Sequence, residues 1–320
     1  MLLRNFLLSI SALVSWQLVS PVLAATYPIP ATGSVLGQIQ VVTAKYEDTF
    51  LSLGRRYGVG YEEIVAANPG ADPWLPGEGT QIVIPSRYIL PDAPREGIVV
   101  SLAEHRLYYF PAPRANEVPV VITYPISVGK MDWKTPLGLT RITDKRTRPI
   151  WYPPESVRKE HAADGRPLPK AVPPGPDNPL GNYAMRLGIP GGAYLIHGTN
   201  RPEGVGMQVT HGCIRMYPED IEQFFKMVNV NTSVRIIHQP YKMGWIGDEL
   251  YMEVHAPLEG SSEQDARSLT QITRLLVTAT QDRPGGVIDW AKAEETFSRA
   301  TGIPEAVMLG TPTSQLVDTP

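Results

Sequence analysis

The sequence predicts a multidomain α+β protein with three folded parts. The first is a small strand–helix–helix–strand module, the second a mainly antiparallel β-sandwich or barrel-like domain with one packed helix, and the third a partly helical C-terminal region. A chain of 320 residues is long enough for two or three domains. Strand patterns dominate its middle, and helical spacing is confined to short segments. The 32 prolines, about twice the usual share of roughly 5%, predict rigid turns and few long helices.

Composition excludes several functional classes. The chain carries 29 basic and 32 acidic residues, so its net charge is -3. This balance argues against a nucleic-acid binder, because displacing counterions from phosphates requires a broad basic surface. The single cysteine, Cys213, excludes a disulfide scaffold and any zinc site built from several cysteines. We expect no cofactor and no bound metal.

The segment 1–24 is typical of a secretory signal peptide. Arg4 is its only charged side chain, an apolar run extends over 6–19, and Ala24 is the small residue that a signal peptidase prefers. An uncleaved membrane anchor is the alternative, because about 20 apolar residues can span a bilayer. Polar residues and Pro21 within the segment weaken that alternative. We expect cleavage, export and no other membrane-spanning segment.

A small module is expected to follow a linker. Residues 25–37, mostly Pro, Gly, Ala and Thr, predict the linker. The next segment, 38–86, has β-branched runs at 41–42 and 81–84, with two helical patterns between them. The apolar residues at helical spacing are Phe50, Leu53 and Tyr57, then Tyr61, Ile64 and Val65. This order predicts a compact module, which either packs without a ligand or binds one.

The module over 38–86 resembles a LysM module along nearly its whole length. LysM modules bind glycans that contain N-acetylglucosamine, so the resemblance implies a tether to the glycan strands of a cell wall. The matching residues are Asp48-Thr49-Phe50, Ala66-Ala67-Asn68-Pro69, Leu75-Pro76-Gly77 and Gln81-Ile82-Val83-Ile84-Pro85.

The segment 97–240 is predicted to form the β-rich domain. Runs at 98–102 and 106–110 flank a short connection and predict a hairpin. One helix is expected to begin at Pro218, because two acidic residues come after it at the positive end of the dipole and apolar residues recur at helical spacing. Further strands are expected at 120–128, 193–196 and 233–237.

Two other segments have no assigned function. Residues 145–182 form a long, proline-broken stretch, and residues 141–170 carry eight basic and four acidic side chains. Long loops inside compact domains are usually functional or disordered, so this stretch is either a solvated surface loop or a lid that helps to hold an anionic substrate. The C-terminal region, 245–312, starts with a strand-like run and has helical candidates at Gln264–Thr280 and Asp289–Thr301.

The residues best suited to chemistry begin at His197, where an apolar strand ends. Sixteen residues later, a glycine turn presents Cys213. A thiolate is nucleophilic, and an imidazole within hydrogen-bond reach makes or stabilises it, so His197 and His211 are both candidate bases. The neighbouring glycines leave room for a substrate carbonyl and for backbone N–H groups that face an oxyanion. Arg215 adds a positive charge that favours a thiolate or a substrate carboxylate.

Two other interpretations of these residues stay open. Cys213 could be a buried structural thiol beside two packed histidines. Alternatively, His197, His211 and Cys213 could supply the three protein ligands of a catalytic zinc site. The other histidines lack a comparable setting and are expected to be surface or packing residues; they are His105, His161, His238 and His255.

The motifs His197-Gly198-Thr199 and Thr210-His211-Gly212-Cys213-Ile214-Arg215 resemble the signature of L,D-transpeptidases with a YkuD-type catalytic domain. The resemblance spans about 97–240 and extends to the layout of Gram-negative periplasmic members, with a LysM module before this domain and a tail after it. It implies a periplasmic enzyme that acts on the tetrapeptide stems of peptidoglycan. Cys213 would attack the bond between diaminopimelate and D-alanine and pass the acyl group to an amine, which belongs to another diaminopimelate or to the lysine of a Braun-type lipoprotein.

The same resemblance implies a role for each residue of the signature. His197 matches the general acid and base, and the Gly198 carbonyl would orient its ring. The amides of Gly212 and Cys213 would form the oxyanion hole, and His211 matches a supporting position. Carbapenem β-lactams are expected as acylating inhibitors. The residues expected to contact the substrate are Thr199, Thr210 and Arg215.

Rival functions differ in the fate of the thioester. If water replaces the amine, the same chemistry gives an L,D-carboxypeptidase or a crosslink hydrolase. A non-catalytic wall-glycan-binding protein would need only the module, but the intact set of His197, His211 and Cys213 argues against it. Sortases share the order of histidine before cysteine, but they lack the His-Gly-Cys triplet.

Overall fold

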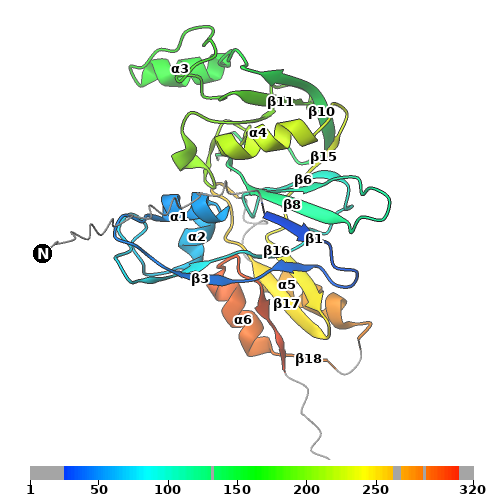
Figure 1. Cartoon of the computed structure of the whole chain (residues 1–320). Coiled ribbons are helices and arrows are strands. Elements are labelled where there is room, and N and C mark those ends of the chain that lie inside the picture. Colours follow the sequence, from blue (N-terminus) through cyan, green and yellow to red (C-terminus); the bar gives the residue numbers. More distant parts are fainter. Residues whose placement is uncertain (1–24, 131–132, 262–267, 284–285, 310–320) are drawn as a thin grey trace, which may run out of the picture.

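The computed structural model describes residues 25–130, 133–261, 268–283 and 286–309, and the expected signal peptide lies outside these ranges. Figure 1 shows three parts: a small module with two helices, a large sheet beside and above it in this view, and a C-terminal region below both. In the described part of the chain, no helix combines the length and the apolar character that crossing a bilayer requires.

The small module has the expected order of elements. They are β3 (Gln40–Thr43), α1 (Phe50–Tyr57), α2 (Tyr61–Ala67) and β4 (Gln81–Ile84). The two strands pair antiparallel. The side chains of Thr49 and Ser52 form a capping box at the start of α1, and Gly58 ends this helix with a left-handed φ of 66°. The buried apolar core of the module is Ala44, Phe50, Leu53, Val59, Ile64, Ile82 and Ile84.

The segment 25–37, expected as a linker, is instead built into the fold. β1 (Ala25–Pro28) pairs antiparallel with β8 (Val120–Pro125), and β2 (Val35–Gly37) pairs antiparallel with β5 (Arg87–Ile89). The high Pro and Gly content suggested a linker. However, Pro28 ends an edge strand, where a missing N–H is tolerated.

The large sheet consists of nine strands. Besides β1 and β8 they are β6 (Gly97–Ser101), β7 (Arg106–Phe110), β10 (Gly138–Thr147), β11 (Tyr183–Leu187), β12 (Leu195–His197), β14 (Ile214–Arg215) and β15 (Ser233–Ile237). Their order is β1-β8-β7-β6-β15-β10-β11-β12-β14. The sheet is mainly antiparallel, as expected, but the pairs β6–β15 and β12–β14 are parallel. A separate parallel pair joins β9 (Val128–Gly129) to β13 (Gln208–Thr210).

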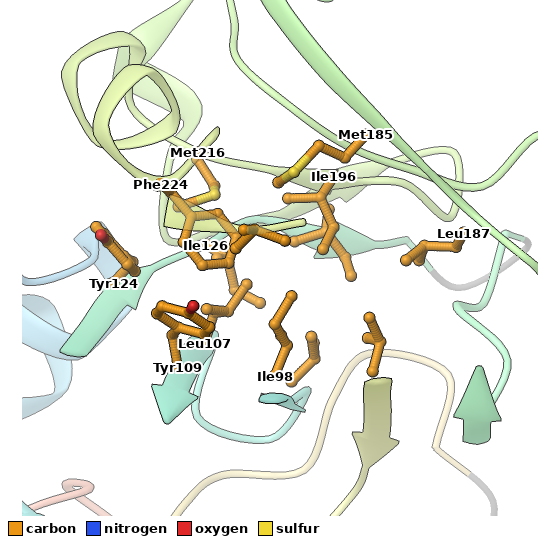
Figure 2. Packing of buried hydrophobic residues seen from close by; sticks show 14 of the residues in the cluster. Ile98, Leu107, Tyr109, Tyr124, Ile126, Met185, Leu187, Ile196, Met216 and Phe224 are labelled. Atoms are coloured by element: carbon orange, nitrogen blue, oxygen red, sulfur yellow. The ribbon is translucent and has the colours of Figure 1, made fainter. Parts of the chain in front are cut away.

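The apolar core of this domain lies between the sheet and α4 (Pro218–Met227), the helix that Pro218 predicts. Figure 2 shows Phe224 of α4 among side chains from the sheet. Its ring centroid lies 5.5 Å from that of Tyr109 and 5.2 Å from that of Tyr124. Complete burial of one such side chain stabilises the fold by roughly 1.5–3 kcal/mol, so this contact anchors the helix to the sheet.

The proline-broken stretch over 145–182 contains a helix that periodicity does not predict, α3 (Glu155–Ala163). The stretch connects the neighbouring strands β10 and β11 and therefore projects from one end of the sheet (Figure 1). The Asn178 side chain fixes the two ends of the stretch where they leave the sheet. It donates to the Pro149 carbonyl at 2.9 Å and accepts from the Leu180 N–H at 2.9 Å. Only Val157 of α3 is buried, so the helix has no apolar stripe for sequence reasoning to detect.

The C-terminal region folds around its own core. Its elements are β16 (Tyr241–Ile246), β17 (Glu249–Val254), α5 (Leu269–Thr280), β18 (Val287–Ile288), α6 (Trp290–Arg299), β19 (Glu305–Ala306) and β20 (Met308–Leu309). α5 and α6 correspond to the two helices expected here, although Gln264 lies outside the described residues. Leu276 of α5 and Ala293 of α6 are buried against the β16–β17 hairpin.

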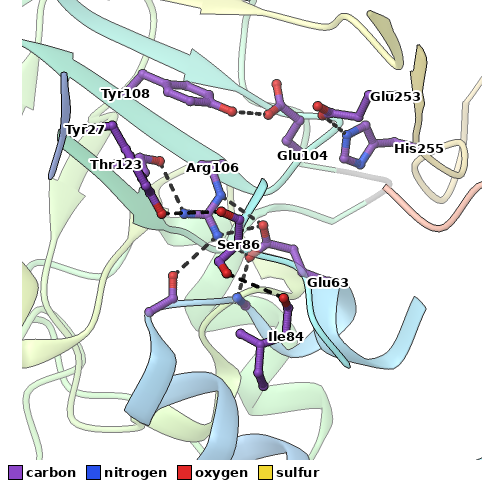
Figure 3. A network of polar contacts seen from close by, with 12 residues as sticks. Tyr27, Glu63, Ile84, Ser86, Glu104, Arg106, Tyr108, Thr123, Glu253 and His255 are labelled. Atoms are coloured by element: carbon purple, nitrogen blue, oxygen red, sulfur yellow. Dashed lines mark hydrogen bonds and ion pairs between the residues drawn. The ribbon is translucent and has the colours of Figure 1, made fainter. Parts of the chain in front are cut away.

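Two buried cations join the three parts. Arg106 of β7 is fully buried and donates to Glu63 of α2 at 2.6 and 2.7 Å (Figure 3). Its guanidinium also lies 4.2 Å from the centroid of the Tyr88 ring. Lys242 of β16 lies 2.8 Å from a carboxylate oxygen of Glu104 and 2.8 Å from one of Glu253. Separating such a pair would leave a charge buried without its partner, which lowers the free energy of unfolding. These pairs therefore fix how the module and the C-terminal region dock on the sheet.

Candidate active site

His197 and Cys213 come from neighbouring strands. β12 ends at His197 and pairs in parallel with β14, where Arg215 lies opposite His197. Cys213 directly precedes β14, so strand pairing brings the cysteine beside the strand that carries the histidine. Both side chains line a cleft of about 810 Å³, here called the main cleft. Sequence spacing could not establish that the two residues share a cleft, because sixteen residues and a loop separate them.

The His197 ring is held in one orientation and one protonation state. Its Nδ1 lies 2.6 Å from the Gly198 carbonyl oxygen, and the side chain is 5% exposed. A carbonyl can only accept, so Nδ1 carries the proton and Nε2 the lone pair. Burial, reinforced by the positive charge of Arg215, lowers the pKa of His197 to about 3. The resting imidazole is therefore neutral and can act as a base through Nε2.

The Cys213 thiol is partly buried, and its Sγ lies 3.6 Å from the Ala193 carbonyl oxygen. Burial raises the pKa of this thiol to about 11, while a hydrogen bond from the Leu195 backbone and the charge of Arg215 act in the opposite direction. The resting group is a thiol rather than a thiolate. It becomes a strong nucleophile only when a base removes its proton as it reacts.

The turn before Cys213 is fixed by two threonine hydroxyls. Thr210 donates to the Cys213 carbonyl at 2.6 Å, and Thr135 donates to the Gly212 carbonyl at 3.0 Å. Gly212 has a φ of 90°, and a Cβ at this position would lie 3.0 Å from the Tyr194 ring. Only glycine adopts this conformation readily in so little space. The role of Thr135 could not be predicted, because 78 residues separate it from Cys213.

His211 lies in the wall of the main cleft, but it is engaged by α3. Its Nε2 lies 2.7 Å from a carboxylate oxygen of Glu160, whose other oxygen accepts from Lys130 Nζ at 2.6 Å. Trp133 packs edge-on against the His211 ring, with centroids 5.2 Å apart. Glu160 was not predicted as a site residue, because its place in a proline-broken, basic stretch gives no catalytic signal.

The remaining predicted site residues differ in position. Arg215 and Thr210 line the main cleft, and Arg215 Nε is buried without a hydrogen-bond partner among the described residues. Thr199 does not line the cleft; it is buried, and its hydroxyl accepts from the Arg201 N–H at 2.9 Å, which shapes the turn after His197. Basic side chains in the cleft wall outnumber acidic ones: Arg146, Arg166, Arg186, Arg201 and Arg215 against Asp144 and Asp177.

The alternative of a zinc site at His197, His211 and Cys213 is not supported by the geometry. Within the described ranges, these residues do not form a set whose potential ligand atoms converge within 4.8 Å. His211 Nε2 is also directed to Glu160 rather than to the thiol. The arrangement instead provides a nucleophile, a neutral base and a glycine turn on one wall of a basic cleft, which suits acyl transfer.

Comparison with known proteins agrees with this geometry. The family profile of the YkuD L,D-transpeptidase catalytic domain matches residues 95–236. The chain is 41% identical to "Probable L,D-transpeptidase YcfS" of Escherichia coli over 254 residues, which cover 78% of each protein. It is 39% identical to "Probable L,D-transpeptidase ErfK/SrfK" of Salmonella typhimurium over 298 residues, 91% of this chain and 93% of the other. "Probable L,D-transpeptidase YbiS" of Escherichia coli is 38% identical over 288 residues, 88% and 91%.

These similarities include the histidine strand and the cysteine turn within 95–236 and extend over both flanking parts. Peptidoglycan crosslinking is the chemistry of this catalytic domain. The chain belongs to the L,D-transpeptidase family.

Proposed function

We propose that Cys213 is the nucleophile of this L,D-transpeptidase and that His197 is its general acid and base. The observation that carries the proposal is the matched protonation of two groups in one cleft: a neutral imidazole with its lone pair on Nε2, and a thiol that keeps its proton. In this arrangement the thiolate forms only as the sulfur attacks. Water and oxidants therefore meet an unreactive thiol between turnovers.

The donor is a peptidoglycan tetrapeptide stem. The Cys213 thiol gives its proton to His197 Nε2 while Sγ bonds to the carbonyl carbon that joins diaminopimelate to D-alanine. The imidazolium returns this proton to the D-alanine nitrogen as the C–N bond breaks, and a thioester remains on Sγ. An acceptor amine then attacks the thioester, and its proton passes through Nε2 to the departing sulfur. The acceptor is a diaminopimelate side chain or the lysine of a Braun-type lipoprotein.

The oxyanion of each tetrahedral intermediate is assigned to the backbone N–H groups of Gly212 and Cys213. The carbonyl and the N–H of one trans peptide point in opposite directions. The hydrogen bond from Thr135 to the Gly212 carbonyl therefore fixes the direction of the Cys213 N–H. Thr135 is thus a positioning residue for this oxyanion donor. Removing one such donor typically lowers kcat by about 10²–10³-fold.

Substrate recognition is assigned to the arginine-rich wall of the main cleft. The donor stem carries free carboxylates, and Arg215 has a buried Nε without a partner among the described residues. A guanidinium binds a carboxylate through two parallel N–H groups. The stretch over 145–182 contributes Arg146 and Arg166 to this wall, which supports its interpretation as a lid for an anionic substrate.

We assign glycan binding to the module over 38–86 and export to the segment 1–24, which together place the enzyme in the periplasm as a LysM-bearing wall protein. The strand–helix–helix–strand order supports the first assignment. So do Tyr46 and Trp74, two exposed aromatic side chains of the kind that pack on sugar rings. The Trp74 ring packs at a tilt against the ring of Tyr61, with centroids 6.2 Å apart.

The nucleophile is tested with Cys213→Ala. Incubation of the wild-type chain with a carbapenem is expected to add the mass of the opened β-lactam, as measured on the intact protein. The variant is expected to fold normally, as judged by circular dichroism, and to form no adduct. An adduct of equal yield on the variant would assign the acylation to another residue.

The reaction itself is tested on tetrapeptide-rich peptidoglycan together with a lysine-ended lipoprotein. Mass analysis of the products is expected to show D-alanine release and a new amide, whose position identifies the acceptor. Tripeptide stems without a new amide would instead indicate an L,D-carboxypeptidase. Glycan binding without any product would indicate a wall-binding protein without transferase activity.

The base is tested by comparing His197→Ala with His211→Ala. The first variant removes the only proton acceptor that we assign, and general bases typically contribute about 10²–10⁴-fold to the rate. We expect carbapenem acylation to slow by this factor in His197→Ala, and by less in His211→Ala. Near-normal acylation by His197→Ala, together with loss in His211→Ala, would transfer the base role to His211.

A further inference from the structure

A second cavity lies where the three parts of the protein meet, and the proposed mechanism does not use it. Its volume is about 460 Å³, and we call it the junction pocket. Val209 of β13 lines both the junction pocket and the main cleft, so the two cavities are adjacent. The glutamates and histidines in its wall come from the module, the sheet and the C-terminal region: Glu62, Glu63, Glu104, His105, His255 and Glu259.

Two buried atoms in this wall have no hydrogen-bond partner among the described residues, namely Glu104 Oε1 and His105 Nε2. The two residues are 2% and 6% exposed. Burial lowers the pKa of His105 to about 3, so its ring is neutral, and its Nδ1 lies 3.3 Å from Glu62 Oε2. The nearby Glu62 carboxylate favours the ring proton on Nδ1, which leaves Nε2 as an acceptor. Both unpartnered atoms therefore require a donor.

The negative charge of the junction pocket is compensated only in part. Glu63 is neutralised by Arg106, which does not line the pocket. No lysine or arginine side chain is among the described residues that line it. Within the described ranges, neither Glu62 nor Glu259 forms an ion pair with a lysine or an arginine. Burial and the negative charge of Glu259 both raise the pKa of Glu62. A bound cation would relieve this repulsion.

The spacing of the acidic groups argues against a metal ion. Metal ligands must converge around one point, and within the described ranges the one set that converges within 4.8 Å is Glu104, Glu253 and His255. Figure 3 shows these three side chains close together. Lys242 already neutralises this set, because its Nζ lies 2.8 Å from a carboxylate oxygen of Glu104 and 2.8 Å from one of Glu253. Of the two unpartnered acceptors, Glu104 Oε1 belongs to a residue of that set and His105 Nε2 lies outside it, which suits an extended ligand with several N–H donors.

We propose that the junction pocket binds an organic ammonium ligand, which donates to Glu104 Oε1 and His105 Nε2 and is balanced by the carboxylates of Glu62 and Glu259. Two sources share this chemistry. One is an ammonium-bearing arm of the acceptor that the adjacent main cleft would consume, and this source rests on the proposed function. The other is a free diamine, whose binding does not depend on catalysis.

The test is calorimetric titration of the full chain at low ionic strength with 1,5-diaminopentane, and with 1,5-pentanediol as the uncharged control. We expect the diamine to bind and the diol not to bind. The double variant Glu62→Gln/Glu259→Gln is expected to raise the diamine Kd at least tenfold. Glu96→Gln, an exposed carboxylate outside the pocket, should leave that Kd unchanged. Equal diamine affinity in the double variant and the wild type, or binding of the diol, would overturn the proposal.

Four further measurements distinguish the possible outcomes. Thermal unfolding of the double variant checks that the three parts remain docked. The same titration with Cys213→Ala is expected to give the wild-type Kd, so the pocket is tested even if the proposed chemistry fails. Ca²⁺ binding that the double variant abolishes, without diamine binding, would overturn the organic class. A raised KM for the acceptor amine in the double variant, with unchanged carbapenem acylation, would identify the acceptor arm as the ligand; an unchanged KM would identify a free diamine.

Discussion

Glu160 is the side chain through which the proline-broken stretch reaches the chemistry. Its carboxylate bridges Lys130 and His211, at 2.6 and 2.7 Å, and its hydrogen bonds to these two residues lower its pKa to about 2. His211 is thus oriented from α3 rather than from the nucleophile. Because the Glu160 carboxylate holds the His211 ring, it also helps to fix the turn that follows His211 and carries Cys213. This arrangement suits a supporting role for His211 in the wall of the cleft.

Glu160→Gln tests this positioning role. The variant keeps the shape of the side chain but weakens both charge-assisted contacts, so we expect kcat/KM for acylation to fall about tenfold, the effect of a small misplacement. Because its pKa is lowered to about 2, the Glu160 carboxylate stays charged and keeps its ion pair with Lys130 until the pH falls toward that value. Titration of Glu160 itself should therefore not change the ratio of wild-type to variant rates between pH 5 and pH 8.

The matched control is Glu155→Gln on the same helix. Glu155 pairs at 2.9 Å with Lys159, and both side chains are exposed. Its loss should leave the acylation rate within twofold of wild type, because an exposed pair contributes little. Equal losses in Glu155→Gln and Glu160→Gln would mean that α3 acts only through its overall stability.

The sequence predicts a site residue when its partners lie close to it along the chain, and misses it when they lie far away. His197 and Cys213 were predicted because each stands next to glycines in a short motif, and the structure places both in one cleft. Thr199 belongs to the same motif, yet its hydroxyl is used within its own turn. Glu160 and Thr135 act on the motif from distant segments, and no local pattern encodes such a contact.

The docking of α2 onto β7 depends on one buried pair. Glu63 accepts from two guanidinium nitrogens of Arg106 and also from the Gly60 N–H at the start of α2. Close approach of the backbone adds to this contact, because a Cβ on Gly60 would lie 2.8 Å from the Gly206 Cα. Strand, helix start and loop are thus joined at one point, so losing the carboxylate should disturb all three.

Glu63→Gln is expected to lower the free energy of unfolding by about 3–5 kcal/mol, because it leaves Arg106 buried without its counter-charge. At roughly 2–4 °C per kcal/mol, the Tm should fall by about 10 °C, measured by scanning calorimetry. Replacing both partners by apolar residues, in Glu63→Leu/Arg106→Met, should restore most of the loss. A single variant within 1 kcal/mol of wild type would show that this pair does not hold the module.

Helices with an apolar stripe were predictable, and segments defined by their neighbours were not. α1, α2, α4 and α6 have patterns of spacing and capping that the sequence displays. α3 is polar almost all round, so its existence depends on the strands that it connects. β1 and β2 are short and rich in Pro and Gly nearby, and they become strands only because β8 and β5 offer them free edges.

The stability of the whole chain is expected to depend on Asp220. This carboxyl is buried in the first turn of α4, and burial, together with the charge of Glu219, raises its pKa to about 7. An acid whose pKa is raised on folding binds more protons in the folded state than in the unfolded state. Stability is therefore fully present below the unfolded-state pKa near 4 and declines as the pH rises toward 7, by up to about 1.4 kcal/mol per pH unit.

Urea unfolding of the wild type and of Asp220→Asn at pH 5, 6, 7 and 8 measures this dependence. The variant cannot ionise at this position, so its stability should change less between pH 5 and pH 7 than that of the wild type. The two curves should run parallel above pH 7.5, where Asp220 is charged in both states of the wild type. Parallel curves over the whole range would mean that Asp220 titrates alike in the folded and unfolded chain.

The relative placement of the three parts could not be predicted from the sequence. Each part has its own apolar core, which periodicity anticipates, but their contacts are made by Arg106, Lys242 and partners far away in the chain. A buried charge pair has no periodic signature. The junction pocket exists only through this arrangement, which is why no segment taken alone suggests it.

β1 is four residues long, yet it occupies the last free position along β8. Without it, the outward N–H and C=O groups of β8 would be open to any other extended chain, and such borders promote self-association. A shortened protein that begins after Pro28 should therefore tend to aggregate even with its chemistry intact. β1 therefore covers the edge of β8 and hinders strand pairing between neighbouring molecules.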